Sequence, residues 1–189
     1  MAKHWPIVLQ SNEIRLQPLR FRDRRKWAQV RAENRDWLSP WEATLPHVPG
    51  YGQQELPSFL EMLRVINSEA NDGRSYSLMV WHENNLIGQI TMGGIIYGAM
   101  RGAHIGYWID RNYAGRGYTT SAVDLLTSFG FNELKLHRIE INVRPENAAS
   151  IRVAEKAGYI FEGVRPRYLH IDGAWRDHHC FVKENTQII

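Results

Sequence analysis

The feature that most constrains this chain is an alternating stretch that runs into a glycine-rich turn and then into a helical pattern. Residues 103–109 place Ile105, Tyr107 and Ile109 on one side, which is the period of a β-strand. Gly106 within that strand indicates a bulge or a place where a ligand comes close. Apolar residues then recur at helical spacing over residues 121–131. The stretch predicts a strand, a loop over residues 110–117 and a helix.

The loop has the composition of an anion site. Gly115 and Gly117 free the backbone to turn its N–H groups into a concavity just before a helix N-terminus, which suits a phosphate. Arg111 and Arg116 add cationic flanks suited to a diphosphate. The loop does not end in Lys-Ser/Thr, which excludes a Walker A loop, and Thr120 replaces the third glycine of the dinucleotide fingerprint. An ordinary tight turn is the alternative.

Residues 112–117 resemble motif A of the Gcn5-related N-acetyltransferases (GNAT), Gln/Arg-x-x-Gly-x-Gly/Ala, except that Asn112 stands at the first position. The resemblance implies that the loop N–H groups bind the pyrophosphate of acetyl-coenzyme A and that the preceding strand hydrogen-bonds to its pantetheine arm. The implied cofactor-binding residues are Trp108, Ile109, Arg111, Asn112, Gly115, Arg116, Gly117, Tyr118, Thr119 and Asn147. For Asn147, a role as a helix cap is an equal and compatible interpretation.

Composition indicates one soluble globular domain: the chain has 189 residues, of which 43% are hydrophobic and 23% charged. Cys180 is the only cysteine, so an internal disulfide is excluded, and we expect a cytoplasmic protein without a membrane span. A net charge of +3 is too small to indicate nucleic-acid binding. Basic residues do cluster over residues 20–26, either as a solvated helix turn or as a steering patch toward a ribosome or an acidic substrate.

A second resemblance lies in residues 33–42, Glu-Asn-Arg-Asp-Trp-Leu-Ser-Pro-Trp-Glu, which follow a helical pattern over residues 23–35 with Asp23 as its N-cap. This segment is similar to one in the bacterial ribosomal-protein alanine N-acetyltransferases of the RimJ/RimL type, and so are residues 171–178. We expect a lid in which Trp37 and Trp41 contact the substrate. Burial of both tryptophans in the core is the alternative.

The other patterns complete an α+β fold. They predict strands over residues 13–19, 75–81, 86–96 and 138–144, helices over 53–71 and 147–157, and a final hairpin of 159–171 and 175–182. The resemblance implies the GNAT fold: a mixed, mostly antiparallel sheet of about seven strands with helices on both faces. In that fold strands 4 and 5 splay apart, and the acetyl thioester lies between them.

Acetyl transfer to an amine needs a proton acceptor, donors toward the carbonyl oxygen and a proton for the departing sulfur. Glu140, on the polar side of strand 138–144, is the candidate base, and Glu33 on the lid is the second choice; for both, an ion pair with an arginine is the alternative. Ser150 matches a serine of RimL-like relatives and is the candidate acid, with helix capping as its alternative. Asn142 and Tyr168 are further candidates for substrate binding.

The sequence Asp177-His-His-Cys180 spells a palmitoyltransferase signature, but the Cys-rich zinc module of that chemistry is missing from the sequence. His178 and Cys180 face one way on a strand and His179 the other, so we expect no metal site.

The resulting hypothesis is an acetyl-coenzyme A-dependent N-acetyltransferase for a protein N-terminus, with a ribosomal protein as the leading acceptor. A peptide α-amine, with a pKa near 8, demands less of a base than a lysine does. The alternatives are an acetyltransferase for a small amine, in which Glu33, Asp36 and Glu42 bind a cation, and a non-catalytic acyl-coenzyme A or RNA-binding module. Either a monomer or a homodimer fits the sequence.

Overall fold

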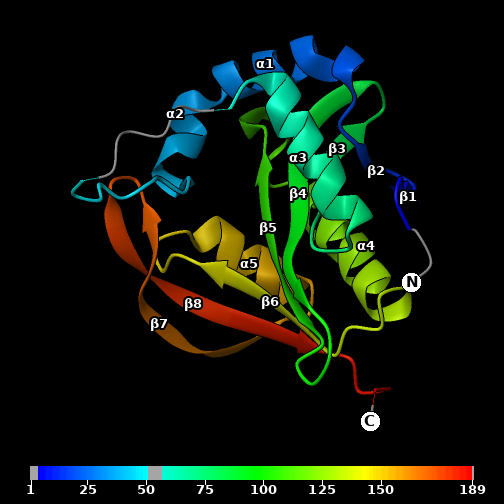
Figure 1. The fold of residues 1–189 in the computed structure, drawn as a ribbon, viewed down its shortest axis with the longest axis vertical. Helices are drawn as coiled ribbons and strands as arrows, with labels where there is room; N and C mark the ends of the chain where they lie inside the picture. The colour runs from blue at the N-terminus through cyan, green and yellow to red at the C-terminus, as the bar shows by residue number, and fades with distance from the viewer. Residues whose placement is uncertain (1–3, 51–56, 189) are drawn as a thin grey trace.

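The protein, seen in a computed structural model that describes residues 4–50 and 57–188, is built on a single mixed sheet (Figure 1). Within those residues the sheet has eight strands in the order β1-β2-β3-β4-β5-β6-β8-β7. The strands are β1 Leu9–Gln10, β2 Arg15–Pro18, β3 Tyr76–His82, β4 Asn85–Ile96, β5 Gly102–Ile109, β6 Arg138–Val143, β7 Ile160–Ile171 and β8 Ala174–Glu184. β5 and β6 run parallel, and the other neighbours are antiparallel. The predicted fold is confirmed, and the strand count exceeds seven because the two-residue β1 is too short to show a period.

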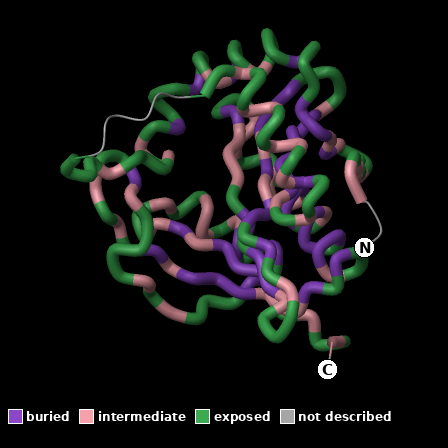
Figure 2. The backbone as a smooth tube through the Cα atoms, in the orientation of Figure 1, coloured by how far each residue is buried: buried purple, intermediate pink, exposed green. Residues whose placement is uncertain are grey.

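Helices cover both faces of the sheet. They are α1 Arg24–Glu33, α2 Arg35–Leu38, α3 Phe59–Asn71, α4 Tyr118–Asn132 and α5 Ala148–Lys156, with short 3-10 turns η1 Phe21–Asp23, η2 Ser39–Trp41 and η3 Arg111–Tyr113. Val123 and Leu126 of α4 join a large core with residues of β4, β5 and β6. Trp27 of α1 and Phe59 of α3 pack with Met79 on the opposite face of β3. Figure 2 shows this burial concentrated in the sheet.

Local signals set where the helices begin. Ser58 Oγ accepts the Glu61 N–H, and the Glu61 carboxylate accepts the Ser58 N–H at 2.8 Å, so a capping box starts α3. Residues 53–56 of the predicted helix lie outside the described residues. Asp23 is the N-cap of α1 as predicted, yet its carboxylate accepts the Arg20 N–H at 3.1 Å and makes no bond to α1. The Asp23 side chain therefore caps the 3-10 turn before α1, and not α1 itself.

β5 and β6 part soon after they meet. Their pairing covers Gly102 with Arg138, Ala103 with Ile139 and His104 with Glu140, whereas β5 continues to Ile109 beside β4 and β6 continues to Val143 beside β8. This divergence confirms the predicted splay between two neighbouring strands (Figure 1). It leaves residues 105–109 of β5 without a strand partner on the side of β6.

The predicted bulge at Gly106 is wrong. Gly106 pairs regularly with Thr91, and the register between β4 and β5 shifts between Gly93 and Ile96. A Cβ atom at Gly94, where φ is +59°, would lie 2.8 Å from the ring of His104. The irregularity therefore falls where the Gly93-Gly94 pair lets β4 bend around that imidazole.

No helix in the described ranges is long and apolar enough to cross a membrane.

The core predicts a clear stability contrast between two leucines on helices. Leu126 is 0% exposed and Leu60 is 48% exposed. We expect Leu126→Ala to lower the free energy of unfolding by about 2–5 kcal/mol, because it removes buried methyl groups and leaves a cavity. Leu60→Ala, with the same change in helix propensity, should stay within about 0.5 kcal/mol of wild type. Urea unfolding followed by circular dichroism measures both, and equal losses would contradict this assignment of the core.

Candidate active site

The loop after β5 has the geometry of an anion site. Gly115 and Gly117 have φ angles of +77° and +88°, which L side chains rarely adopt, and Gly117 is the N-cap of α4. A Cβ atom at either position would meet nothing within 4 Å, so the surface above the loop is open. The first N–H groups of the 15-residue α4 lie directly behind it.

Buried polar side chains brace this loop. Asp110 is buried, and its Oδ1 accepts the Asn112 N–H at 2.9 Å. Asn34, 2% exposed, accepts the Arg111 N–H at 2.8 Å and donates to the carbonyl of Val30 at 2.9 Å. Sequence reasoning did not identify Asn34 as a support of the loop; an asparagine interrupting the helical pattern at the start of the lid was the available signal.

The predicted cofactor residues surround this loop in different ways. Arg116 stacks on the ring of Tyr113, with 5.5 Å from its guanidinium carbon to the ring centroid. Tyr118 is buried, and its ring lies 4.6 Å from that of His82, so only its backbone N–H can face a ligand. Thr119 follows it in the first turn of α4. Trp108 and Ile109 lie in the stretch of β5 that does not pair with β6.

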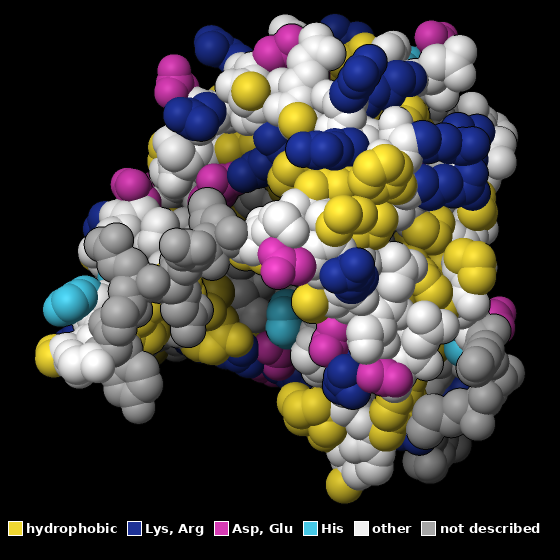
Figure 3. Space-filling model, turned by 45° about the horizontal axis from the view of Figure 1, so that its top comes forward, with side chains coloured by type: hydrophobic (Ala, Val, Ile, Leu, Met, Phe, Trp, Pro, Cys, Tyr) yellow, Lys and Arg dark blue, Asp and Glu magenta, His cyan; other side chains and the backbone are white. Residues whose placement is uncertain are grey.

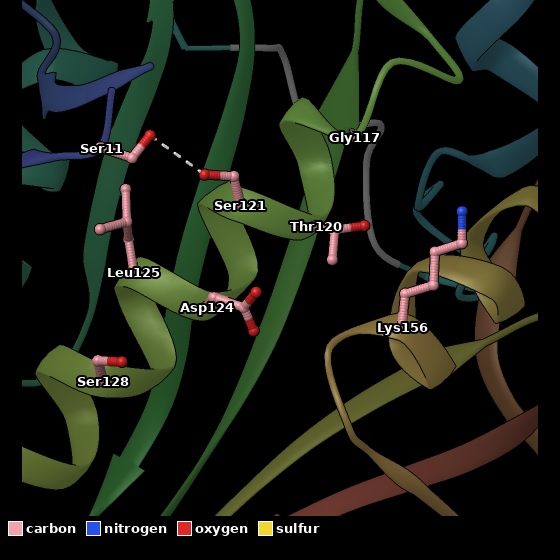
Figure 4. Close-up of a pocket in the computed structure, with 8 residues that line it drawn as sticks. All are labelled: Ser11, Gly117, Thr120, Ser121, Asp124, Leu125, Ser128 and Lys156. Carbon is pink, nitrogen blue, oxygen red and sulfur yellow. Dashed lines mark hydrogen bonds between the residues drawn. The ribbon is translucent and has the colours of Figure 1, made fainter. Parts of the chain in front are cut away.

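A groove continues from the loop along α4. A cavity of about 450 Å³ is lined by Ser11, Gly117, Thr120, Ser121, Asp124, Leu125, Ser128 and Lys156. In Figure 4, Thr120 of α4 and Lys156 of α5 project into the space between their helices. The groove therefore joins the anion site to a further cation.

The N-terminus of α5 lies at the opening between β5 and β6. Asn147 Oδ1 accepts the Ser150 N–H at 3.0 Å, so the predicted helix cap is present. The Tyr107 hydroxyl donates to the Ser150 carbonyl at 3.2 Å and ties α5 to β5 across the opening. Burial raises the pKa of Tyr107 to about 12, so this donor keeps its proton at neutral pH. The Ser150 hydroxyl has no partner among the described residues.

The two candidate bases are placed very differently. Glu140 is buried, and its carboxylate accepts from Arg138 at 2.9 Å and from Arg165 at 2.7 Å, so the ion-pair alternative is present. Glu33 is exposed at the end of α1 and accepts from Gln29 Nε2 at 2.8 Å. The structure brings Glu140 to the edge of the opening and leaves Glu33 outside the cavity described next.

A second cavity, of about 300 Å³, lies under the predicted lid. It is lined by Leu38, Trp41 and Glu42 of the lid and by Gln89, Thr91, Gly106, Tyr107 and Trp108 of β4 and β5. Figure 3 shows a hollow in the surface on this side of the molecule, where acidic, basic and histidine side chains are visible. Gln89 and Thr91 both hydrogen-bond Ser77, at 2.9 and 3.0 Å. Sequence reasoning missed this polar cluster, although polar residues alternating within an apolar strand were a visible signal.

The lid, residues 33–42, and the residues just after it are bonded to the strands on both sides of the opening. The Trp37 indole N–H donates to the Ile109 carbonyl at 3.1 Å. Arg144, at the end of β6, donates to the Pro40 carbonyl at 2.8 Å and stacks on Trp41. Thr44 donates its N–H to the His170 carbonyl at 2.9 Å. Trp37 and Trp41 are each 36% exposed, so the alternative of simple core residues is wrong.

The remaining site candidates lie on β6 and β7. We call the face of β6, β7 and β8 that lies across the opening from β5 the floor of the site. Asn142 Oδ1 is buried without a hydrogen-bond partner. Tyr168 lies beside His178, with ring centroids 5.7 Å apart, and under Arg165. His178 and Cys180 are buried on one face of β8, while His179 packs against Phe161 on the other. The described residues contain no group of three His, Cys, Asp or Glu side chains placed to hold a metal ion.

Comparison with known proteins agrees with this geometry. Residues 13–160 match the family model for the acetyltransferase (GNAT) domain. A probable N-acetyltransferase YjcK of Bacillus subtilis (strain 168) is 34% identical, over 90% of this chain and 93% of that protein. The ribosomal protein uS5-alanine N-acetyltransferase of Escherichia coli (strain K12) is 28% identical, over 91% of this chain and 88% of its own.

Solved structures show the same likeness. The structure of Mycobacterium smegmatis RimJ in complex with CoA-disulfide superposes with a TM-score of 0.88 at 32% identity, covering 100% of this chain and 92% of that one. The family match spans most of the sequence, and the glycine loop, the mixed sheet and the splayed strands are those expected from the family. The chain belongs to the GNAT acetyltransferase family.

Proposed function

We propose that this acetyltransferase moves the acetyl group of acetyl-coenzyme A directly to the N-terminal α-amine of a protein, with a ribosomal protein as the acceptor. The observation that carries the proposal is the opening between β5 and β6. It begins below the glycine loop, and its β5 side, residues 106–108, lines the cavity under the lid. A coenzyme bound at the loop and an amine bound under the lid would meet in this opening.

The loop and groove fit the coenzyme. The N–H groups behind Gly115 and Gly117 would bind its diphosphate, with Arg116 and Lys156 as nearby cations. The backbone groups of β5 that face β6 beyond His104 have no strand partner and would hydrogen-bond the pantetheine arm. When bound, the coenzyme supplies the activated thioester. Support comes from the Mycobacterium smegmatis relative, whose structure contains a CoA-disulfide.

The charge balance under the lid favours a peptide over a polyamine. Glu42 of the lid pairs with Arg31, and Glu140 pairs with Arg138 and Arg165. Because these carboxylates are already neutralised, little negative charge is left in the cavity to attract a polycation. The likeness to the uS5-alanine enzyme supports a protein N-terminus. The exposed Arg22, Arg24 and Arg25 would steer the enzyme toward the ribosome.

Roles in the reaction follow from the geometry. Backbone N–H groups of β5 near Gly106 would polarise the thioester oxygen, and the Ser150 hydroxyl would give a proton to the departing sulfur. Removal of the amine proton by Glu140 requires one of its two ion pairs to open first. Trp41, Asn142 and Tyr168 would contact the acceptor.

Substitution in the loop tests the coenzyme site. Gly117→Val should lower the affinity for coenzyme A at least tenfold, since valine strongly resists a φ of +88° and the loop must change shape. Gly98→Val is the matched control, because Gly98 has a φ of +72°, equally open space and a place in the β4–β5 turn. Isothermal titration calorimetry measures both. Unchanged affinity in Gly117→Val, or equal losses in the two variants, would argue against the loop as the diphosphate site.

The acceptor class is tested with a matched pair of peptides. A peptide with the N-terminal sequence of ribosomal protein S5 should release free thiol from acetyl-coenzyme A, because its α-amine is partly neutral at pH 7. The same peptide blocked by Nα-acetylation keeps its side chains and should give none. Spermidine serves as the small-amine comparison. If spermidine or the blocked peptide were acetylated and the unblocked peptide were not, the acceptor would not be a protein α-amine.

Ser150→Ala separates the proposed acid from the cap. The cap uses the backbone N–H of Ser150, so the variant should keep the melting temperature of wild type. Loss of the hydroxyl should lower kcat about 10²-fold. Steady-state kinetics and a thermal melt decide the matter: an unchanged kcat would leave Ser150 with a structural role only.

A further inference from the structure

The floor opposite β5 contains two hydrogen-bond acceptors, on Asn142 and His178, for which the described residues supply no donor. Among the residues that the structure describes, the buried side-chain polar atoms without partners are three donors and one acceptor, Asn142 Oδ1. The second acceptor is the Nε2 atom of His178, which is not one of these fully buried atoms. An acceptor left unpaired in a protein interior is costly, and a ligand N–H group would relieve that cost.

Hydrogen bonding sets the tautomer of His178. Its Nδ1 lies 3.0 Å from the carbonyl oxygen of Arg176. A carbonyl can only accept, so Nδ1 carries the proton and Nε2 keeps its lone pair. Nε2 has no hydrogen-bond partner in the described part of the chain. The Tyr168 ring packs edge-on against the imidazole, at an interplanar angle of 71°.

Strand registers place both acceptors on the cavity side of the sheet. Trp108 and Gly106 line the cavity and alternate with the core residues of β5, as His104 does. His104 pairs with Glu140, so the even-numbered residues of β6 share that face. Asn142 pairs with Cys180, and His178 is the next residue of β8 on the same face. Diagonal neighbours of this kind lie about 7–8 Å apart, which leaves room for one amine nitrogen between the two side chains.

His178 is kept neutral near pH 7. Burial, at 3% exposure, lowers its pKa from the usual 6.5, and the charge of Arg144 acts in the same direction. The hydrogen bond to Arg176 and the charges of Glu146 and Asp177 oppose that shift. Charged groups face His178 from β6 and the loop after it (Arg144, Glu146), from β7 (Arg165) and from its own strand (Arg176, Asp177).

We propose that His178 is the base of the reaction and that Asn142 holds the acceptor amine against it; this inference rests on the proposed transfer to an α-amine. The amine nitrogen attacks the thioester carbon, the C–N bond forms and the nitrogen becomes acidic. His178 Nε2 takes one proton from it while Asn142 Oδ1 accepts a remaining N–H. The C–S bond breaks, the thiolate takes a proton from Ser150, and the imidazolium restores that proton through water. Glu140 keeps both of its ion pairs throughout.

The test compares His178→Gln with His179→Gln, a neighbouring histidine on the opposite face of β8. With the unblocked peptide at pH 7, His178→Gln should lower kcat about 10²-fold, while the KM for acetyl-coenzyme A stays within about twofold. The deficit should shrink by pH 9, where hydroxide in the solvent can take the proton from the attacking nitrogen in place of His178. His179→Gln should keep wild-type kcat and pH dependence. A kcat loss that is equal at both pH values, or no loss, overturns the assignment to His178.

Nitrogen NMR of ¹⁵N-histidine-labelled protein bound to coenzyme A gives a readout that does not depend on turnover. We expect the His178 signals of a neutral ring protonated at Nδ1 at pH 7, identified by their absence in His178→Gln. An imidazolium or an Nε2-protonated ring overturns the inference whatever the acceptor is. Failure of the wild-type enzyme to acetylate any free α-amine would instead overturn the proposed function.

Discussion

The architecture of this enzyme depends on where the pairing of β5 with β6 stops. Each strand pairs along most of its length with a partner on its other side, β4 for β5 and β8 for β6, and the two share only three residue pairs. Beyond His104 and Glu140 the backbone groups of β5 that face β6 lack a strand partner. Such groups must be satisfied by water or by a ligand. The stretch that weakens the sheet is thus the one that can receive the coenzyme arm.

The divergence is stabilised from both sides. At the closed end, the His104 ring fits against the glycine pair of β4, where a Cβ atom at Gly94 would lie 2.8 Å from it. At the open end, the Tyr107 hydroxyl reaches α5 and fixes the width of the gap. The lid adds bonds to Ile109 on one arm and to Arg144 on the other. These contacts join elements on both sides of the gap, so the site is organised before substrate arrives.

The charged side chains near the site form a further part of its organisation. The arginines on the floor are paired with carboxylates, Arg165 with Glu140 and Arg144 with Glu146. Paired charges of this kind cost less to bury and leave less net field on an incoming amine. The two acceptors without partners, Asn142 Oδ1 and His178 Nε2, would then accept hydrogen bonds from the N–H groups of the incoming amine. The ion pairs on the floor stabilise the fold, and the neutral acceptors would contact the reacting amine.

The sequence by itself determined the local units: the strand, glycine loop and helix of residues 102–132, the cap at Asn147 and the final hairpin. Their signals are short-range, since a φ requirement, a cap or a period acts within a few residues. Tertiary structure alone decided which residues meet across the sheet. The His104 ring lies against Gly93-Gly94 because the register of β4 with β5 pairs Gly93 with His104. Glu140 meets Arg165 because β8 inserts between β6 and β7. Asn34 reaches the backbone of Arg111, 77 positions away, and the register of β8 sets which face of the sheet carries His178, so no local pattern encodes either placement.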